Sequence, residues 1–96
     1  MGKIKINNII KQKPASLHIA CGRKYKLDWI NIDEDINIRC DAVINIKKGI
    51  PVKDNSVKYI YNEHFIEHLS YKKGFQFMKE CYRILEPGGV LRIACP

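Results

Sequence analysis

Short apolar runs alternate with polar turns along the chain from residue 17 onward. Each run holds four or five residues and is rich in isoleucine, valine and other strand-forming side chains, which is typical of buried β-strands. We expect five strands, at Leu17–Ala20, Trp29–Ile32, Ala42–Ile46, Val57–Tyr61 and Val90–Ala94. Residues 1–16, in which lysine alternates with isoleucine and asparagine up to Pro14, are expected to form a lead-in segment before one domain of residues 17–96.

One stretch between the fourth and fifth runs has helical spacing instead. Its apolar side chains recur three and four residues apart, at Phe75, Met78, Cys81, Tyr82 and Leu85. A helix would bring these side chains onto one side, so we expect this stripe to form core against the sheet. The sequence Pro87-Gly88-Gly89 that follows is typical of a helix end.

Four strands, a helix and a fifth strand predict a mainly parallel α/β sheet with few helices. The connections between the first three strands are short. Only about eight to ten residues separate these strands, whereas a parallel crossover usually takes a dozen or more. Either these connections are reduced to loops or some neighbouring strands are antiparallel, and we favour loops.

The composition is that of one small globular domain of 96 residues with a net charge of +7. No run reaches the ~20 apolar residues of a membrane span, and we expect a cytoplasmic protein without a membrane partner. The positive charge is compatible with a nucleic-acid partner, but the basic residues are dispersed, which favours a solvated lysine-rich surface. The four cysteines form no C-x-x-C pair, so we expect reduced, buried thiols and no metal site.

Polar residues with binding chemistry follow the predicted strands. Gly22 follows the first strand and Asp33 the second, Asn45 lies near the end of the third, and Asn62 and Glu63 follow the fourth. In a parallel sheet these ends meet at the edge where α/β proteins bind ligands. Glycine lets the backbone approach a ligand, a carboxylate can accept bonds from two ribose hydroxyls, and an amide can read a base edge. The arrangement therefore predicts a nucleotide-type cofactor site.

Several segments together resemble the class I S-adenosylmethionine-dependent methyltransferases, and in particular a compact branch with short loops. Leu17-His18-Ile19-Ala20-Cys21-Gly22 and Asp28-Trp29-Ile30-Asn31-Ile32-Asp33 resemble the first two motifs of that family. The segment from Ile50 to Tyr61 resembles its "LPF-x-DNS-FD-x-V" stretch, and Glu67-His68-Leu69 resembles its "EHL". The segment from Tyr82 to Leu91 is similar to its "R-V-L-K-P-G-G-x-L" corner. These segments follow the family's order over residues 17–96.

The resemblance implies a Rossmann-like sheet with strand order 3-2-1-4-5. It also implies an S-adenosylmethionine cofactor, a methyl acceptor of unknown identity, and roles for eight residues. Ala20, Cys21 and Gly22 would line the methionine part and Asp33 would bind the ribose. Asn45 and Ile46 would face the adenine, and Asn62 and His64 would lie beside the sulfonium. Glu63 and His64 are positioned candidates for the chemistry, and no catalytic base is assigned.

The chain departs from the family pattern in three respects. Ala20 and Lys24 stand where glycine is common, and Asn45 stands where an acid is often seen. The family's sheet has seven strands, whereas this pattern ends at the fifth, so the carboxy-terminal strands are missing. The fifth strand would then be an open edge suited to self-association. The chain could therefore be a methyltransferase, a non-catalytic cofactor-binding or interaction module, or a basic nucleic-acid-binding domain, in that order of preference.

Some of these residues have other interpretations. His64-Phe65-Ile66-Glu67-His68 matches the H-x-x-E-H string of zinc peptidases, but a strand-to-helix turn is the preferred interpretation. Cys21 near Arg23 and Lys24 could be a reactive thiol, although a buried packing cysteine is preferred. Asp33 could be a simple strand-end acid. The Arg23–Lys26 cluster could contact an anion, although a solvated loop is preferred.

Overall fold

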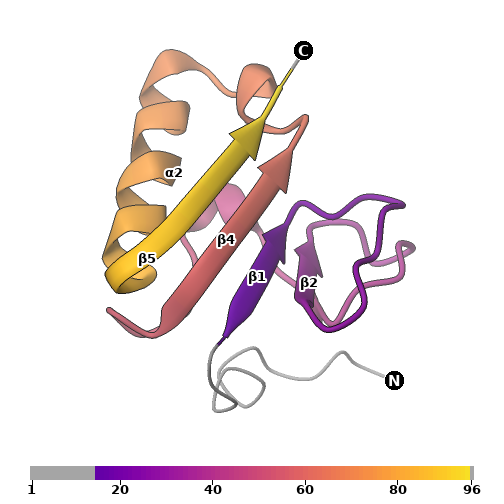
Figure 1. Cartoon of the computed structure of the whole chain (residues 1–96). Coiled ribbons are helices and arrows are strands. Elements are labelled where there is room, and N and C mark those ends of the chain that lie inside the picture. Colours follow the sequence, from indigo (N-terminus) through magenta and orange to yellow (C-terminus); the bar gives the residue numbers. More distant parts are fainter. Residues whose placement is uncertain (1–14, 96) are drawn as a thin grey trace.

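The computed structural model describes residues 15–95, which form a five-stranded sheet with one α-helix packed on it (Figure 1). The strands are β1 (Ser16–Ile19), β2 (Ile30–Asp33), β3 (Ala42–Val43), β4 (Val57–Glu63) and β5 (Leu85–Ala94). The helix is α2 (Tyr71–Ile84), and two 3₁₀ turns are η1 (Ile46–Lys48) and η2 (Ile66–His68). The strand order is β3-β2-β1-β4-β5 and every neighbouring pair is parallel. The predicted Rossmann-like sheet and its order are confirmed.

The expected lead-in segment lies mostly outside the described residues. Ser16 is already the first residue of β1, and Ala15 is buried in the core. The Ala15 carbonyl also accepts a hydrogen bond of 2.9 Å from the Lys58 backbone N–H. These last two residues of the expected lead-in therefore belong structurally to the sheet.

Loops alone make the first two crossovers, as the preferred interpretation of the short connections predicted. Neither the β1–β2 nor the β2–β3 connection contains a helix. Backbone bonds hold these loops close to the sheet: the Cys21 N–H donates to the Ile32 carbonyl over 3.1 Å, and the Asp41 N–H donates to the Asn31 carbonyl over 2.7 Å. The antiparallel alternative is wrong, because β1–β2 and β2–β3 both pair in parallel.

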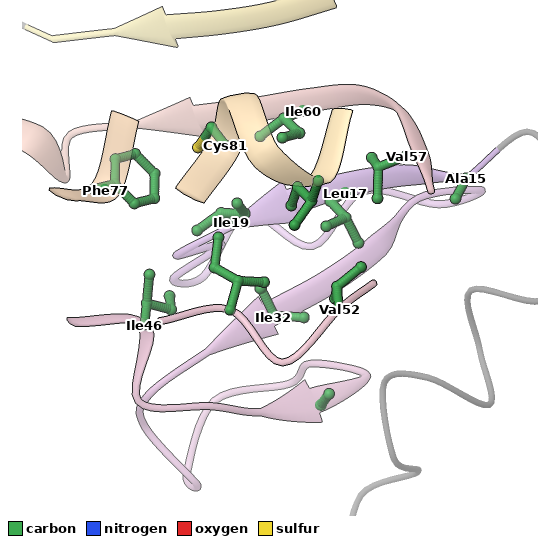
Figure 2. Close-up of a cluster of buried hydrophobic side chains, with 13 residues drawn as sticks. Ala15, Leu17, Ile19, Ile32, Ile46, Val52, Val57, Ile60, Phe77 and Cys81 are labelled. Carbon is green, nitrogen blue, oxygen red and sulfur yellow. The ribbon is translucent and has the colours of Figure 1, made fainter. Parts of the chain in front are cut away.

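The hydrophobic core lies between α2 and one face of the sheet (Figure 2). Alternate residues of the central strands point into it, because successive strand side chains lie on opposite faces. Buried contributors from the strands and helix include Leu17, Ile19, Ile32, Ile60, Phe77, Cys81 and Ile84. This core holds the carboxyl ends of β1, β2 and β4 at one edge of the sheet.

The buried side of α2 differs from the predicted stripe. Of the five predicted residues only Cys81 is fully buried, whereas Phe75, Met78 and Tyr82 are exposed. The residues that face the core are Gly74, Phe77, Cys81 and Ile84. Both sets have helical spacing, so periodicity alone does not choose between them. Contacts with distant segments choose between them, such as the edge-on packing of Phe77 against Phe65 with ring centres 5.2 Å apart.

Helix α2 begins at a clear signal and ends earlier than Pro87-Gly88-Gly89 predicted. The Ser70 hydroxyl caps its first turn by accepting a bond of 3.1 Å from the Lys73 N–H. The helix ends at Ile84, and β5 begins at Leu85 rather than Val90. The register between β4 and β5 shifts between Val57 and Tyr59, so the Pro-Gly-Gly segment lies in an irregular part of β5. Gly88 has φ +83°, a conformation that favours glycine.

The third strand is shorter than predicted, at Ala42–Val43 rather than Ala42–Ile46. The Ile44 N–H still donates to the Asp33 carbonyl over 2.9 Å, but the chain then turns into η1. The segment after η1 is tied to α2 by Arg83. Its guanidinium donates to the Ile50 and Val52 carbonyls, each over 2.7 Å.

Candidate functional site

The turn after β1 meets the end of β2 through a direct hydrogen bond. The Gly22 N–H donates to Asp33 Oδ2 over 2.9 Å. Gly22 has φ +55°, and a Cβ added there would meet no atom within 4 Å, so open space lies beside this backbone. The predicted glycine turn and its distant acid are therefore in contact, with room for a ligand next to the glycine.

The Asp33 carboxylate retains capacity to bind a ligand. Its Oδ1 accepts from the Asp35 N–H over 3.0 Å, while Oδ2 accepts from Gly22. An ionised carboxylate has about four lone-pair positions, so each oxygen can accept a further bond. The residue is half-buried. A diol presented at this edge could therefore bond to both oxygens.

Cys21 is a packing residue rather than a reactive thiol. Its side chain is buried, and its Sγ lies 3.7 Å from the Arg39 carbonyl oxygen. Burial, with a further contribution from the Asp33 charge, raises the pKa of the Cys21 thiol to about 11. The thiol is thus protonated at neutral pH, and the reactive interpretation is not supported.

Asn62 joins β4 to the end of β1 and carries an unpaired polar atom. Its Nδ2 donates to the Ile19 carbonyl over 2.9 Å, next to Ala20. Its Oδ1 is buried and has no hydrogen-bond partner among the described residues. A buried acceptor without a partner is unfavourable by about 1–3 kcal/mol, which often marks a functional position.

His64 follows β4 in a strained conformation, with φ +54°. Its side chain lies between two carboxylates, with Nε2 3.4 Å from Glu63 Oε1 and Nδ1 3.6 Å from Glu67 Oε2. The backbone is held by a bond of 2.9 Å from the His64 N–H to the Ala94 carbonyl. Across residues 15–95 no three side chains are placed to hold a metal ion, and η2 places His68 in a short turn rather than on a helix with His64.

Lys24 is mostly exposed, in keeping with the solvated loop expected for its cluster, and it also contacts the last residue of β4. Its Nζ lies 2.9 Å from Glu63 Oε1, and the Tyr61 hydroxyl donates to Glu63 Oε2 over 3.0 Å. The hydrogen bond from Lys24 lowers the pKa of the Glu63 carboxyl below its usual value. Sequence spacing carries no signal for this contact, because 39 residues separate the pair. Only the parallel pairing of β1 with β4 brings these two segments together.

Asn45 and Ile46 occupy different environments. Asn45 is exposed before η1, whereas Ile46 is buried and belongs to the core cluster. Ile46 also lines a cavity of about 570 Å³ together with Phe65 and Lys73. Gly22 opens on another cavity, of about 630 Å³, lined by residues that include Tyr25, Asp35 and Arg39. Gly22, Ile46 and Asn45 thus each line a different hollow.

The residues present fit a nucleoside-type cofactor. The open space at Gly22, the remaining capacity of Asp33 and the unpaired Oδ1 of Asn62 all lie at the carboxyl ends of three adjacent strands. Backbone N–H, carboxylate and amide groups at this edge match the donors and acceptors of such a ligand.

Comparison with known proteins gives the same family. Residues 23–93 match the family model described as "Methyltransferase domain". A Mycolicibacterium smegmatis protein named "Probable S-adenosylmethionine-dependent methyltransferase/" is 43% identical over 57 residues, which cover 55% of this chain and 21% of that protein. A Listeria innocua protein described as uncharacterized is 32% identical over 65 residues, covering 65% of this chain and 14% of that protein.

Solved structures share the fold. A Pyrococcus horikoshii OT3 protein superposes with a TM-score of 0.70 at 16% identity, covering 92% of this chain and 51% of its own. A Methanococcus maripaludis protein superposes with a TM-score of 0.58 at 18% identity, and the match covers 92% of this chain and 52% of that protein's chain. The chain thus spans about half the length of these structures and a smaller part of the curated relatives. Because the family model matches well over half of the sequence, the chain belongs to the methyltransferase domain family.

Proposed function

We propose that this chain binds S-adenosylmethionine and takes part in methyl transfer to an acceptor of unknown identity. The contact between Gly22 and Asp33 carries this proposal, because it assembles a glycine turn and a ribose-type carboxylate at one sheet edge. Membership of the methyltransferase domain family and the name of the Mycolicibacterium smegmatis relative support the same cofactor.

The proposed contacts follow the sheet edge. Ala20, Cys21 and Gly22 bind the methionine part through the backbone, since the Cys21 side chain is directed into the protein. Asp33 binds the ribose hydroxyls, Asn45 and Ile46 contact the adenine, and Asn62 and His64 lie beside the sulfonium. The bound cofactor supplies an electrophilic methyl group. The chain contributes chiefly by orienting the reactants, which can lower the barrier substantially without a strong base.

Glu63 and His64 are our candidates for accepting a proton from an incoming nucleophile. They lie together at the end of β4, and Glu63 is held by Lys24 and Tyr61. This arrangement supplies fixed acceptors next to the proposed sulfonium position. We assign neither residue as the catalytic base.

Calorimetric titration of the full chain with S-adenosylhomocysteine, the demethylated product, tests cofactor binding. We expect saturable binding, and Asp33→Ala to weaken it at least tenfold because the ribose hydroxyls lose their acceptors. Glu34→Ala removes the exposed neighbouring acid and serves as the matched control. Circular dichroism confirms that each variant is folded. Absence of binding at millimolar ligand would overturn the cofactor proposal, and an unchanged affinity in Asp33→Ala would overturn the ribose assignment.

We also infer that the chain acts in the cytoplasm. Cys21, Cys81 and Cys95 form no disulfide, which is typical of proteins in reducing compartments. No helix in residues 15–95 is long and apolar enough to cross a membrane.

Self-association is a second candidate property, favoured by two features of the molecule. β5 is the last strand of the described sheet, so one of its edges is unpaired there. An exposed stripe on α2 is formed by Tyr71, Phe75, Met78 and Tyr82. Glu80, which accepts a hydrogen bond from the Ile50 N–H, lies on the opposite flank of the helix. We propose that a second copy covers both features. The size of the chain in solution tests this.

A further inference from the structure

The sheet has a second face that is built differently from the core face. In β1, Leu17 and Ile19 point into the core, while His18 between them points to the other side. His18 lies in register with Asn31 on β2 and with Tyr61 on β4. Parallel strands covered on both faces are almost continuously hydrophobic, whereas these strands alternate apolar and polar residues. The second face therefore carries the polar side chains of β1, β2 and β4 alongside aromatic ones.

Only part of this second face is covered within residues 15–95. The β1–β2 loop lies over the β1 and β2 part, where the Lys26 N–H donates to Asn31 Oδ1 over 2.9 Å and His18 is buried. The part over β4 and β5 remains open, with Tyr59 exposed by 40% and Val90 by 52%. Figure 1 shows β4 and β5 side by side with α2 against them.

Aromatic and cationic side chains gather on this open part. A shallow cavity of about 330 Å³ is lined by Trp29, Tyr59, Tyr61, Val90, Lys26 and Arg92, which we call the aromatic face. Lys26 Nζ lies 4.9 Å from the centre of the Tyr61 ring, and the Arg92 guanidinium carbon lies 5.9 Å from it. Neither cation forms an ion pair with a carboxylate of the described residues.

Glu63, at the end of β4, does not neutralise Lys26 or Arg92. Glu63 lies on the same sheet face as Tyr59 and Tyr61, because side chains two positions apart on a strand share a face. Its carboxylate accepts hydrogen bonds from Lys24 and from the Tyr61 hydroxyl. The whole chain carries a net charge of +7, which attracts polyanions over long range. The aromatic face thus combines ring surfaces with unpaired positive charge.

This combination fits one class of ligand. Unpaired bases stack on aromatic rings exposed on a sheet, while lysine and arginine contact the phosphates between them. A duplex does not offer its base faces in this way, because they are stacked within the helix. Among single-stranded polynucleotides, RNA commonly presents such unpaired bases in loops and ends. We propose that the aromatic face binds single-stranded RNA, independently of the cofactor site.

The single tryptophan of the chain gives a direct readout of this site. Trp29 lines the aromatic face, and no other residue can contribute tryptophan fluorescence. The full chain is titrated with a single-stranded RNA of about 12 nucleotides, a length within the usual site sizes. Fluorescence anisotropy of the labelled RNA reports affinity, and quenching of Trp29 reports contact with this face. We expect both signals to saturate together, whether or not S-adenosylhomocysteine binds.

Matched variants separate stacking from general charge attraction. Tyr59→Ala should weaken RNA binding about tenfold, whereas Tyr59→Phe keeps the ring and should bind normally. Tyr71→Ala removes a tyrosine that is 92% exposed on α2 and should have no effect. Arg92→Gln should reduce the slope of log affinity against log salt by about one, and more than Lys72→Gln does.

Four results would overturn the proposal. The first is an equal loss of RNA affinity in Tyr59→Ala and Tyr71→Ala, and the second is a duplex that binds as tightly as the single strand. The third is RNA binding that leaves Trp29 fluorescence unchanged, and the fourth is tighter binding of single-stranded DNA than of RNA of the same sequence. Heparin serves as the polyanion control, and we expect Tyr59→Ala to leave its binding unchanged.

Discussion

At the residue scale, the candidate site contains two backbone conformations that disfavour side chains. Ala20 has φ +56° after β1, and His64 has φ +54° after β4. These strands are neighbours, with Ile19 in register with Asn62, so both residues lie at the same edge. Strain of this kind persists only where surrounding contacts impose it and is frequent at functional sites.

Replacing Ala20 with glycine should stabilise the fold. The left-handed conformation is unfavourable for alanine, whereas glycine adopts it freely. Glycine also raises the conformational entropy of the unfolded chain, which offsets part of this gain in stability. We expect Ala20→Gly to raise the free energy of unfolding by about 0.5–1 kcal/mol, measured by urea denaturation. Ala42→Gly, in the buried β3, is the control and should lower it. A loss of stability in both variants would show that Ala20 is not strained.

His18 should make stability fall in mild acid. Burial lowers the pKa of the His18 imidazole, against the opposing hydrogen bond to Asn31. The unfolded chain then binds the proton more readily, so stability is full above the ordinary histidine value of ~6.5 and declines as pH falls below it. Urea denaturation between pH 8 and 5 should show this decline, with a smaller one in His18→Leu. That variant keeps Asn31 Oδ1 paired with the Lys26 N–H. Parallel curves for the two proteins would contradict the assignment.

At the element scale, α2 shows how one helix can satisfy two apolar periodicities. The stripe of Gly74, Phe77, Cys81 and Ile84 faces the sheet, while the α2 stripe of Tyr71, Phe75, Met78 and Tyr82 faces outward. Phe77 packs edge-on against Phe65, with ring centres 5.2 Å apart. The outward Phe75 contacts Lys79, whose Nζ lies 5.5 Å from its ring centre.

Two phenylalanines two positions apart should therefore respond very differently to truncation. Phe77 is 4% exposed and Phe75 is 58% exposed. We expect Phe77→Ala to lower the free energy of unfolding by about 3–5 kcal/mol through lost burial and a cavity, and Phe75→Ala by less than about 1 kcal/mol. Thermal and urea denaturation measure both. If Phe77→Ala does not fold, the milder Phe77→Leu should still be less stable than Phe75→Leu. The reverse order would mean that the helix is rotated.

At the scale of the whole molecule, the proposed second copy would cover the α2 stripe and the edge of β5 that is unpaired in the described sheet. A second copy related by a two-fold axis could pair β5 with its counterpart and bring the two α2 stripes together, since a two-fold interface uses the same surface twice. Each chain carries a charge of +7, so the copies repel one another at low salt.

Self-association should therefore strengthen as salt is added. We expect sedimentation velocity to show a larger dimer fraction at ~0.5 M than at ~0.05 M salt, because screening weakens the repulsion. Phe75→Glu should abolish the dimer by placing a charge in the α2 stripe. Tyr59→Glu, on the opposite face of the sheet, should retain it. A monomer at every salt and protein concentration would argue against the second copy. RNA binding is expected to weaken with salt, so the two properties are distinguishable.

The sequence predicted most positions of the candidate site but not the environments of the side chains there. Gly22 and Asp33 were expected to meet, and they do, because both follow strands that pair in parallel. Asn45 and Ile46 were both expected to face the adenine, yet one is exposed and the other is core, because β3 ends three residues earlier than predicted. Lys24 entered the site only through its contact with Glu63, between segments far apart in the sequence.

The sequence by itself indicated where the strand runs lie and which acid and glycine follow them, because local alternation and turn residues specify short strands. It favoured a parallel sheet but left antiparallel neighbours open. It also carried the family motifs. Tertiary structure decided which side of α2 is buried, because contacts such as that of Phe77 with Phe65 choose between two sets of apolar residues that both have helical spacing. It also decided which sheet face stays open and which charges pair across it. These properties depend on contacts between distant segments, and such contacts exist only once the chain has folded.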